Sequence, residues 1–195
     1  MKHAKSEAAL PQGGIFYGWF IVASVFFTTA SAAGTIYAFP AFFDSFSREF
    51  GANRFEVSLV FAISECVWFS TGFAAGFLAD RIGPRLVVLG GSVFMAGGLA
   101  LAAAAGSMEM LYVAYGVGVG IGGGSMYVPS VGVIQRWFRR RRGLASGLAI
   151  CGTGVGTLVV PFLTTMVIDS YGWRTAHQVL AVGILAVCGA ASLVL

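Results

Sequence analysis

The stretch "GFLADRIGPR", residues 76–85, places a small group of charges between two long apolar runs. Asp80, Arg81 and Arg85 belong to a chain that has only 12 Lys and Arg and 8 Asp and Glu in 195 residues. The dipeptide Gly83-Pro84 between them is typical of a turn. The stretch is therefore predicted to be a tight, charged turn that joins two apolar helices.

The composition around this turn is that of a membrane protein. Hydrophobic residues make up 57% of the chain and charged residues 10%, whereas soluble domains carry about 25% charged residues. A membrane-spanning helix needs about 20 residues. We interpret the net charge of +4 as a result of basic residues that orient the protein in the membrane. We therefore expect no nucleic-acid partner.

Six apolar runs have nearly the length of a span. They cover about residues 17–43, 55–79, 86–105, 110–135, 143–168 and 176–195. The connections between them contain turn residues and charges, and none is long enough to form a soluble domain. We expect an all-α membrane protein in which a leader, residues 1–16, precedes a six-helix transmembrane bundle, residues 17–195.

Basic residues indicate the orientation of the bundle. With a cytoplasmic N-terminus, the inner side carries Lys2, Lys5, Arg81, Arg85, Arg136, Arg139, Arg140, Arg141 and Arg142, and the outer side carries Arg48, Arg54 and Arg174. Lys and Arg are enriched in cytoplasmic loops of membrane proteins. We therefore predict a multi-pass protein of the plasma or inner membrane with its N-terminus in the cytoplasm.

An internal repeat divides the bundle into two units. "DRIGPR" at 80–85 and "DSYGWR" at 169–174 share the pattern D-x-x-G-x-R at an offset of 89 residues, which makes Asp169, Gly172 and Arg174 the counterparts of the first loop. "GTIY" at 34–37 and "GSMY" at 124–127 match at an offset of 90. Units of three spans, about 17–105 and 110–195, must enter the membrane from opposite sides. Such inverted repeats commonly build secondary transporters.

The charged turn resembles a signature loop of the major facilitator superfamily. The residues that match its G-x-x-x-D-R-x-G-x-R core are Gly76, Asp80, Arg81, Gly83 and Arg85. Residues 127–156, with an aromatic and basic loop followed by R-G-L-A-x-G, resemble the monocarboxylate transporter and oxalate/formate antiporter branch. The superfamily has twelve helices in two halves, so the resemblance implies that this chain is the N-terminal half and that the C-terminal half is absent.

The resemblance also implies that the loop is a gating element. Read from its residues, Gly76 permits close helix approach, and Asp80 pairs with Arg81 or Arg85 or caps a helix. Pro84 suits the first turn of the following helix. A turn that serves only topology is the alternative interpretation.

Polar residues inside the spans are the candidates for a substrate cavity. Tyr37 and Tyr127 are related by the repeat, and Thr35 and Ser125 accompany them; helix packing is the alternative role for these hydroxyls. Glu65 lies deep in the second span, where an ionisable group costs about 2.5–3.5 kcal/mol on insertion scales. It is either a proton-coupling site or a protonated structural residue.

The cargo implied by the branch resemblance is a small organic anion, such as a monocarboxylate, oxalate or formate. No Lys or Arg lies inside the six expected spans, so a cationic partner would come from the missing half or from a second copy. The chain alone leaves symport and antiport open. A self-associating half-transporter, a non-transporting sensor and a carrier of a different solute are alternatives.

Other chemistry finds little support in the sequence. Cys66, Cys151 and Cys188 lie in apolar runs and are interpreted as small buried hydrophobic residues. His3 and His177 are far apart and have no ligand cluster, so we expect no metal. No catalytic motif marks an enzyme, and no cofactor is implied.

Two glycine-rich stretches are interpreted as packing surfaces. "GVGIGG" at 118–123 matches a dinucleotide-binding pattern, but it lies inside an apolar span and follows no strand. Glycines at this density let helices approach closely, as do those of "GTGVG" at 152–156.

Overall fold

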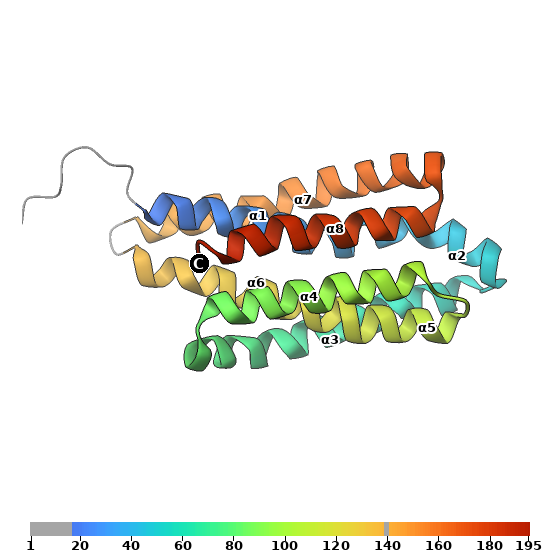
Figure 1. Cartoon of the computed structure of the whole chain (residues 1–195), viewed down its shortest axis with the longest axis horizontal. Coiled ribbons are helices and arrows are strands. Elements are labelled where there is room, and N and C mark those ends of the chain that lie inside the picture. The colour runs from blue at the N-terminus through green and yellow to red at the C-terminus, as the bar shows by residue number, and fades with distance from the viewer. Residues whose placement is uncertain (1–16, 139–140) are drawn as a thin grey trace, which may run out of the picture.

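The computed structural model describes residues 17–138 and 141–195, in which helices run side by side along one axis (Figure 1). Six helical segments are long and apolar enough to span a membrane: Gly18–Phe50, Arg54–Ile82, Pro84–Ala103, Met108–Trp137, Arg142–Tyr171 and Trp173–Ser192. The predicted leader, with Lys2, His3 and Lys5, and the loop residues Arg139 and Arg140 lie outside the described residues.

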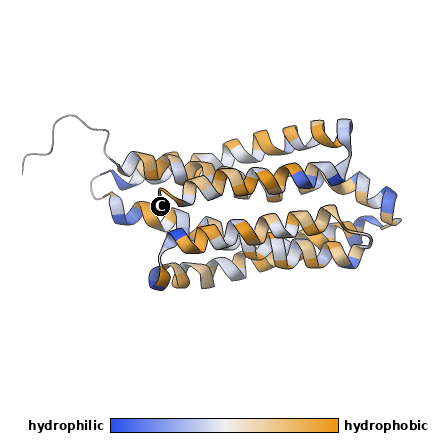
Figure 2. Cartoon of the chain, viewed as in Figure 1, coloured by the Kyte–Doolittle hydropathy of each residue, from blue (hydrophilic) through white to orange (hydrophobic). Residues whose placement is uncertain are grey.

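Ten helical elements make up the described chain. They are α1 (Gly18–Tyr37), the 3₁₀ turn η1 (Phe39–Phe42), α2 (Phe43–Phe50), α3 (Arg54–Ile82), α4 (Pro84–Ala103), α5 (Met108–Val113), the π-helical segment η2 (Ala114–Gly120), α6 (Ile121–Trp137), α7 (Arg142–Tyr171) and α8 (Trp173–Ser192). Apolar residues cover the length of these helices, and hydrophilic ones gather at the two ends of the bundle (Figure 2). This distribution fits a bundle whose sides face lipid.

The α3–α4 and α7–α8 hairpins have matching bounds. α4 and α8 each contain 20 residues, and each hairpin turns at a single glycine. These glycines, Gly83 (φ 94, ψ 145) and Gly172 (φ 82, ψ 163), adopt nearly the same conformation, which is essentially restricted to glycine. The two turns lie at opposite ends of the bundle (Figure 1), as an inverted repeat requires. Pro84 begins α4, as expected.

Equivalent helices of the two repeats make equivalent contacts. α1 packs against α7, α6 packs against α3, and α4 packs against α8. Glycines allow the helix backbones to come close in the α1–α7 pair and in the α3–α6 pair. A Cβ on Gly156 of α7 would collide with the Ala30 carbonyl of α1, and one on Gly124 of α6 would collide with the Trp68 carbonyl of α3. Such contacts between small residues are typical of membrane bundles.

The glycines of 118–123 have the predicted packing role. Gly118 and Gly122 lie against Gly98 and Met95 of α4, with no room for a Cβ. The sequence did not reveal that the first part of this stretch, to Gly120, belongs to a π-helical segment, η2. Gly76 does not have the expected role, because a Cβ there would meet the Val128 side chain at an ordinary 3.4 Å.

Two further expectations are corrected. Residues 44–54 were expected to form only a connection, but α2 occupies most of this stretch, because Phe42, Phe46 and Phe50 recur at helical spacing and pack on Trp173 and one another. Of the three cysteines, only Cys188 is buried. Cys66 and Cys151 lie on the exposed surface of α3 and α7.

Candidate functional site

Tyr37, Glu65 and Tyr127 line one pocket of about 240 Å³. Tyr37 lies at the end of α1, Glu65 is near the middle of α3, and Tyr127 comes from α6. The rest of the wall consists of Ala33, Ile36, Trp68, Phe69, Val128 and Thr153. The structure thus brings together two of the four predicted cavity residues, Tyr37 and Tyr127, with the proton-coupling candidate Glu65, and it draws them from both repeats.

Aromatic packing holds the two tyrosines in place. Trp68 is buried against Gly123 of α6, and its ring lies 6.3 Å from the ring of Tyr127. The Thr153 hydroxyl donates to the Tyr127 hydroxyl oxygen over a distance of 3.5 Å. The Tyr37 ring lies 6.3 Å from Phe61. Because Thr153 can supply the donor, the Tyr127 hydroxyl hydrogen remains available to a ligand.

Glu65 presents a carboxyl group to an otherwise weakly polar wall. It is partly buried, and no hydrogen bond or ion pair from the described residues reaches its carboxyl oxygens. Ionisable groups within membrane spans generally face a cavity or the bundle interior and serve a function. Glu65 can therefore bind a proton or a ligand without breaking an existing contact.

The remaining two predicted residues lie elsewhere. Thr35 is buried and lines a separate cavity between α1, α7 and α8. Ser125 faces α4, where its Cβ packs against Gly91. Neither hydroxyl lines the pocket that holds Tyr37 and Tyr127.

Asp80, in the last turn of α3, has a partner that the sequence reading did not predict. It pairs with Arg136 of α6, and the two side chains are 66% and 56% exposed. Arg81 instead lies 4.4 Å above the Phe77 ring, and α4 has no side-chain cap. The prediction that Asp80 pairs with Arg81 or Arg85, or caps a helix, is therefore wrong. The Asp80–Arg136 ion pair thus connects the end of α3, in the first repeat, to α6 of the second repeat.

At the opposite end, Arg174 in the first turn of α8 makes the ion pair. Its guanidinium donates to Glu49 of α2 at 2.6 Å and to the Ala105 carbonyl at 3.1 Å. Glu49 also accepts the indole N–H of Trp173 at 2.6 Å. Asp169, the counterpart of Asp80, is exposed. One arginine thus connects α2, α8 and the α4–α5 connection.

A family model described as the Major Facilitator Superfamily matches residues 21–195. The chain belongs to the Major Facilitator Superfamily. Its members are transporters, so the chain is related to transporters and not to enzymes. The multi-pass bundle is accordingly an integral membrane protein.

Curated relatives of this superfamily chain include monocarboxylate transporters. The chain is similar to "Monocarboxylate transporter 13" of Rattus norvegicus, with 33% identity over 85% of the chain and 38% of the relative. It also matches "Monocarboxylate transporter 3" of Mus musculus, with 32% identity over 86% of the chain and 34% of the relative. The chain therefore spans less than two fifths of these relatives' length.

Solved structures support the superfamily fold. A crystal structure of the peptide transporter POT with alafosfalin superposes with a TM-score of 0.78 at 20% identity, covering 93% of this chain and 39% of that one. A proton-dependent oligopeptide transporter structure gives a TM-score of 0.76 at 20% identity, covering 90% and 42%. At this identity the likeness concerns the fold. The chain corresponds to half of the superfamily architecture.

Sequence reasoning missed a buried polar pair within this superfamily bundle. His177 of α8 and Tyr115 of η2 are both buried, with 2.8 Å between the imidazole Nε2 and the phenol oxygen. The His177 Nδ1 lies 2.8 Å from the Trp173 carbonyl. A carbonyl only accepts, so Nδ1 carries the hydrogen and Nε2 accepts from Tyr115. A histidine inside an apolar run was the available signal.

Proposed function

We propose that the protein is part of a secondary transporter that moves small organic anions, such as monocarboxylates, oxalate or formate, by alternating access. The observation that carries this proposal is the shared pocket of Tyr37, Glu65 and Tyr127. The similarity to proteins named monocarboxylate transporters supports the choice of cargo. The closely matched hairpins of the two repeats support an alternating mechanism.

Two tyrosines can bind a carboxylate without a buried cation. Each phenol hydroxyl donates one hydrogen bond, and hydrogen bonds to a charged acceptor are stronger than neutral ones. Ile36, Trp68 and Val128 offer apolar contact for a small carbon skeleton. The wall has no Lys or Arg. A cationic partner would come from a C-terminal half or from a second copy of the chain.

Glu65 would couple the anion to a proton. An ionised Glu65 repels a carboxylate in the same pocket, because charges interact strongly in a medium of low dielectric constant. A protonated Glu65 removes this repulsion and gains an O–H donor. Binding of the anion and of the proton then favour each other by the same factor. This reciprocity supports symport of an anion with a proton.

The end of the bundle that contains Asp80 would face the cytoplasm. Among the described residues this end carries Arg81, Arg85, Arg136, Arg141 and Arg142, and the opposite end carries Arg48, Arg54 and Arg174. This bias follows the rule that cytoplasmic loops are rich in Lys and Arg. The Asp80–Arg136 pair would then belong to a cytoplasmic gate of a carrier in the plasma or inner membrane.

Transport into proteoliposomes tests the proposal. The coding sequence is first read beyond the codon for Leu195, and the natural protein is reconstituted with labelled lactate, formate or oxalate outside. We expect saturable uptake that increases when the outside is acidified. Tyr37→Phe and Tyr127→Phe should each lower kcat/KM about tenfold, because each loses a hydrogen bond to a charged group.

Matched variants separate the site from general damage. Tyr171→Phe makes the same change at a tyrosine that is 74% exposed and outside the pocket, and it should leave uptake unchanged. Glu65→Gln should retain anion exchange but lose stimulation by external acid. A reading frame that stops at Leu195, together with absent uptake of all three anions, would contradict the proposal. A stable dimer in that case would favour the self-associating half.

A further inference from the structure

A second cavity, of about 290 Å³, lies between α1, α7 and α8. It shares no lining residue with the pocket of Tyr37 and Tyr127. Its wall is aliphatic except for the hydroxyl residues Ser31, Thr35 and Thr164. Several lining residues, such as Leu163 and Val179, are about half exposed on the outer surface. The cavity is therefore accessible from the side of the bundle.

The repeat explains why the cavity exists. In the first repeat, α4 packs closely through Gly91 against Gly122 and through Gly98 against Gly118. The positions 89 residues later in α8 are Leu180 and Val187, which line the cavity. These larger side chains prevent the close backbone approach that glycines allow. Space consequently remains between α8 and α1.

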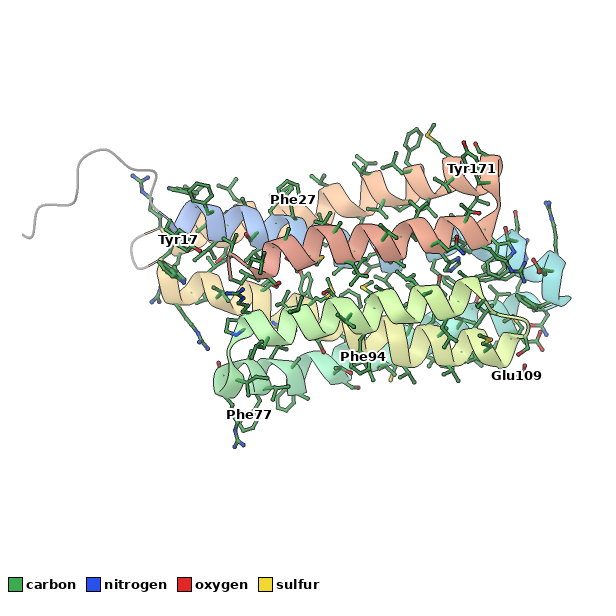
Figure 3. The ribbon with its side chains drawn as sticks, in the orientation of Figure 1. Tyr17, Phe27, Phe77, Phe94, Glu109 and Tyr171 are labelled. Carbon is green, nitrogen blue, oxygen red and sulfur yellow. The ribbon has the colours of Figure 1, made fainter. Side chains whose placement is uncertain are left out.

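A second position of α8 also differs between the repeats. Phe94 of α4 (Figure 3) has Gly183 of α8 as its counterpart 89 residues later. Gly183 lines the cavity, and a Cβ added there would have no atom within 4 Å. Phe94 itself is 54% exposed and borders a separate cavity beside Gly98 and Gly118, so the residue at this position, glycine or phenylalanine, decides how far the side chain of the helix extends over its cavity.

Thr164 adds an unused polar group. Its residue is 3% exposed, and its hydroxyl is the one buried side-chain N or O atom of the described residues without a hydrogen-bond partner. Its counterpart in α3 is the buried Ala75, which has no polar side-chain atom. A buried hydroxyl without a partner is unfavourable, and a ligand that bonds to it would remove that penalty.

We infer that this cavity binds a small amphiphile from the bilayer, with an apolar body and one hydroxyl group that pairs with Thr164. A medium-chain alcohol has this chemistry. Apolar cavities of about 150 Å³ already bind benzene, so 290 Å³ holds a larger aliphatic body. The partly exposed residues of α7 and α8 leave the cavity open at the outer surface of this six-helix bundle.

Photolabelling tests the site directly. The full protein in lipid nanodiscs is irradiated with an octanol that carries a diazirine, and labelled residues are mapped by mass spectrometry. Labels are expected on Leu163, Leu180 and Val187, and excess octanol should remove them. Gly183→Phe, which introduces the residue of the first repeat, should reduce labelling at least tenfold. Gly189→Phe is the control, because Gly189 is on the same helix, has open space and lies outside the cavity.

The hydroxyl is tested by Thr164→Val, which keeps the side-chain shape. Competition by octanol should weaken about fivefold, the effect of one hydrogen bond, while competition by octane should not change. Labelling that is the same in Gly183→Phe and the natural protein would overturn the site. Equal competition by octanol in Thr164→Val would overturn the role of Thr164. Both results are independent of anion transport.

Discussion

In the α3–α4 loop the ion pair is made by the acid of the D-x-x-G-x-R motif, whereas in the α7–α8 loop it is made by the base. Asp80 pairs with Arg136 of α6, and Arg174 pairs with Glu49 of α2. The backbones nevertheless agree. In each loop the glycine N–H donates to the carbonyl four residues earlier, and the glycine has a positive φ. The glycine thus determines the backbone conformation of each turn. The charged residues on either side of it can therefore form ion pairs with different partners in the two repeats.

The difference makes the two ends of the bundle unequal. Asp80 and Arg136 are more than half exposed, and exposed ion pairs contribute little to stability. Arg174 and Trp173 both bind Glu49, and the buried pair of His177 and Tyr115 lies one turn further along α8. We expect the Asp80 end to open more readily than the Glu49 end. This asymmetry agrees with the proposed gate.

The largest expected effect on stability concerns the two glycines whose backbone conformation is nearly the same in both turns. Gly83→Ala and Gly172→Ala each force an alanine into a conformation that only glycine adopts readily, and each should lower the free energy of unfolding by about 1–3 kcal/mol. Chemical unfolding in detergent measures the loss. Gly90→Ala, within α4 and in open space, should cause no loss. A loss in only one loop would show that the two turns are not equivalent.

The buried pair gives the next effect. Tyr115→Phe leaves the His177 Nε2 without its donor and should lower the free energy of unfolding by about 1–2 kcal/mol. The same measurement on Tyr17→Phe serves as control, because the Tyr17 hydroxyl bonds to the Val194 carbonyl at the exposed, opposite end. That loss should stay below about 0.5 kcal/mol. Equal losses would contradict the proposed difference in rigidity.

The ion pairs themselves give the smallest effect. Glu49→Ala removes an acceptor used by Trp173 and Arg174 and should cost about 1 kcal/mol, whereas Asp80→Ala should cost about 0.5 kcal/mol or less. Unfolding curves of the two variants, recorded in the same detergent and salt, measure the difference. A greater loss for Asp80→Ala would reverse the assignment of the weaker end.

Much of the fold could be predicted from the sequence because membrane spans are long and the repeat is regular. The 89-residue offset between the loops places α4 and α8 in register, residue for residue. Tyr37 and Tyr127 are 90 residues apart, which differs by one residue from the offset between the two loops. They therefore occupy equivalent places in the two repeats, and both line the same pocket. Thr35 and Ser125 illustrate the limit, because two residues along a helix turn a side chain to another face.

Contacts between distant segments could not be predicted. Nearby sequence offers Arg81 and Arg85 to Asp80, but the partner is 56 residues away on α6. α2 was missed because its apolar face has few residues and its main partners, Trp173 and His177, lie at the far end of the chain. The pairing of Tyr115 with His177 likewise depends on how η2 is placed against α8.

The packing of α1 against α7 has a consequence for synthesis. The Thr29 hydroxyl of α1 donates to the Ala149 carbonyl of α7, 120 residues later in the chain, at 3.0 Å. Of the six described spans, α1 leaves the ribosome first, and α7, against which it packs, leaves it fifth. Contacts between distant segments form late and at a cost in chain entropy. Until α7 arrives, α1 lies in the translocation machinery or the lipid without its most extensive native partner, although α6 is already present. A ribosome stalled before residue 142 therefore holds an incomplete bundle.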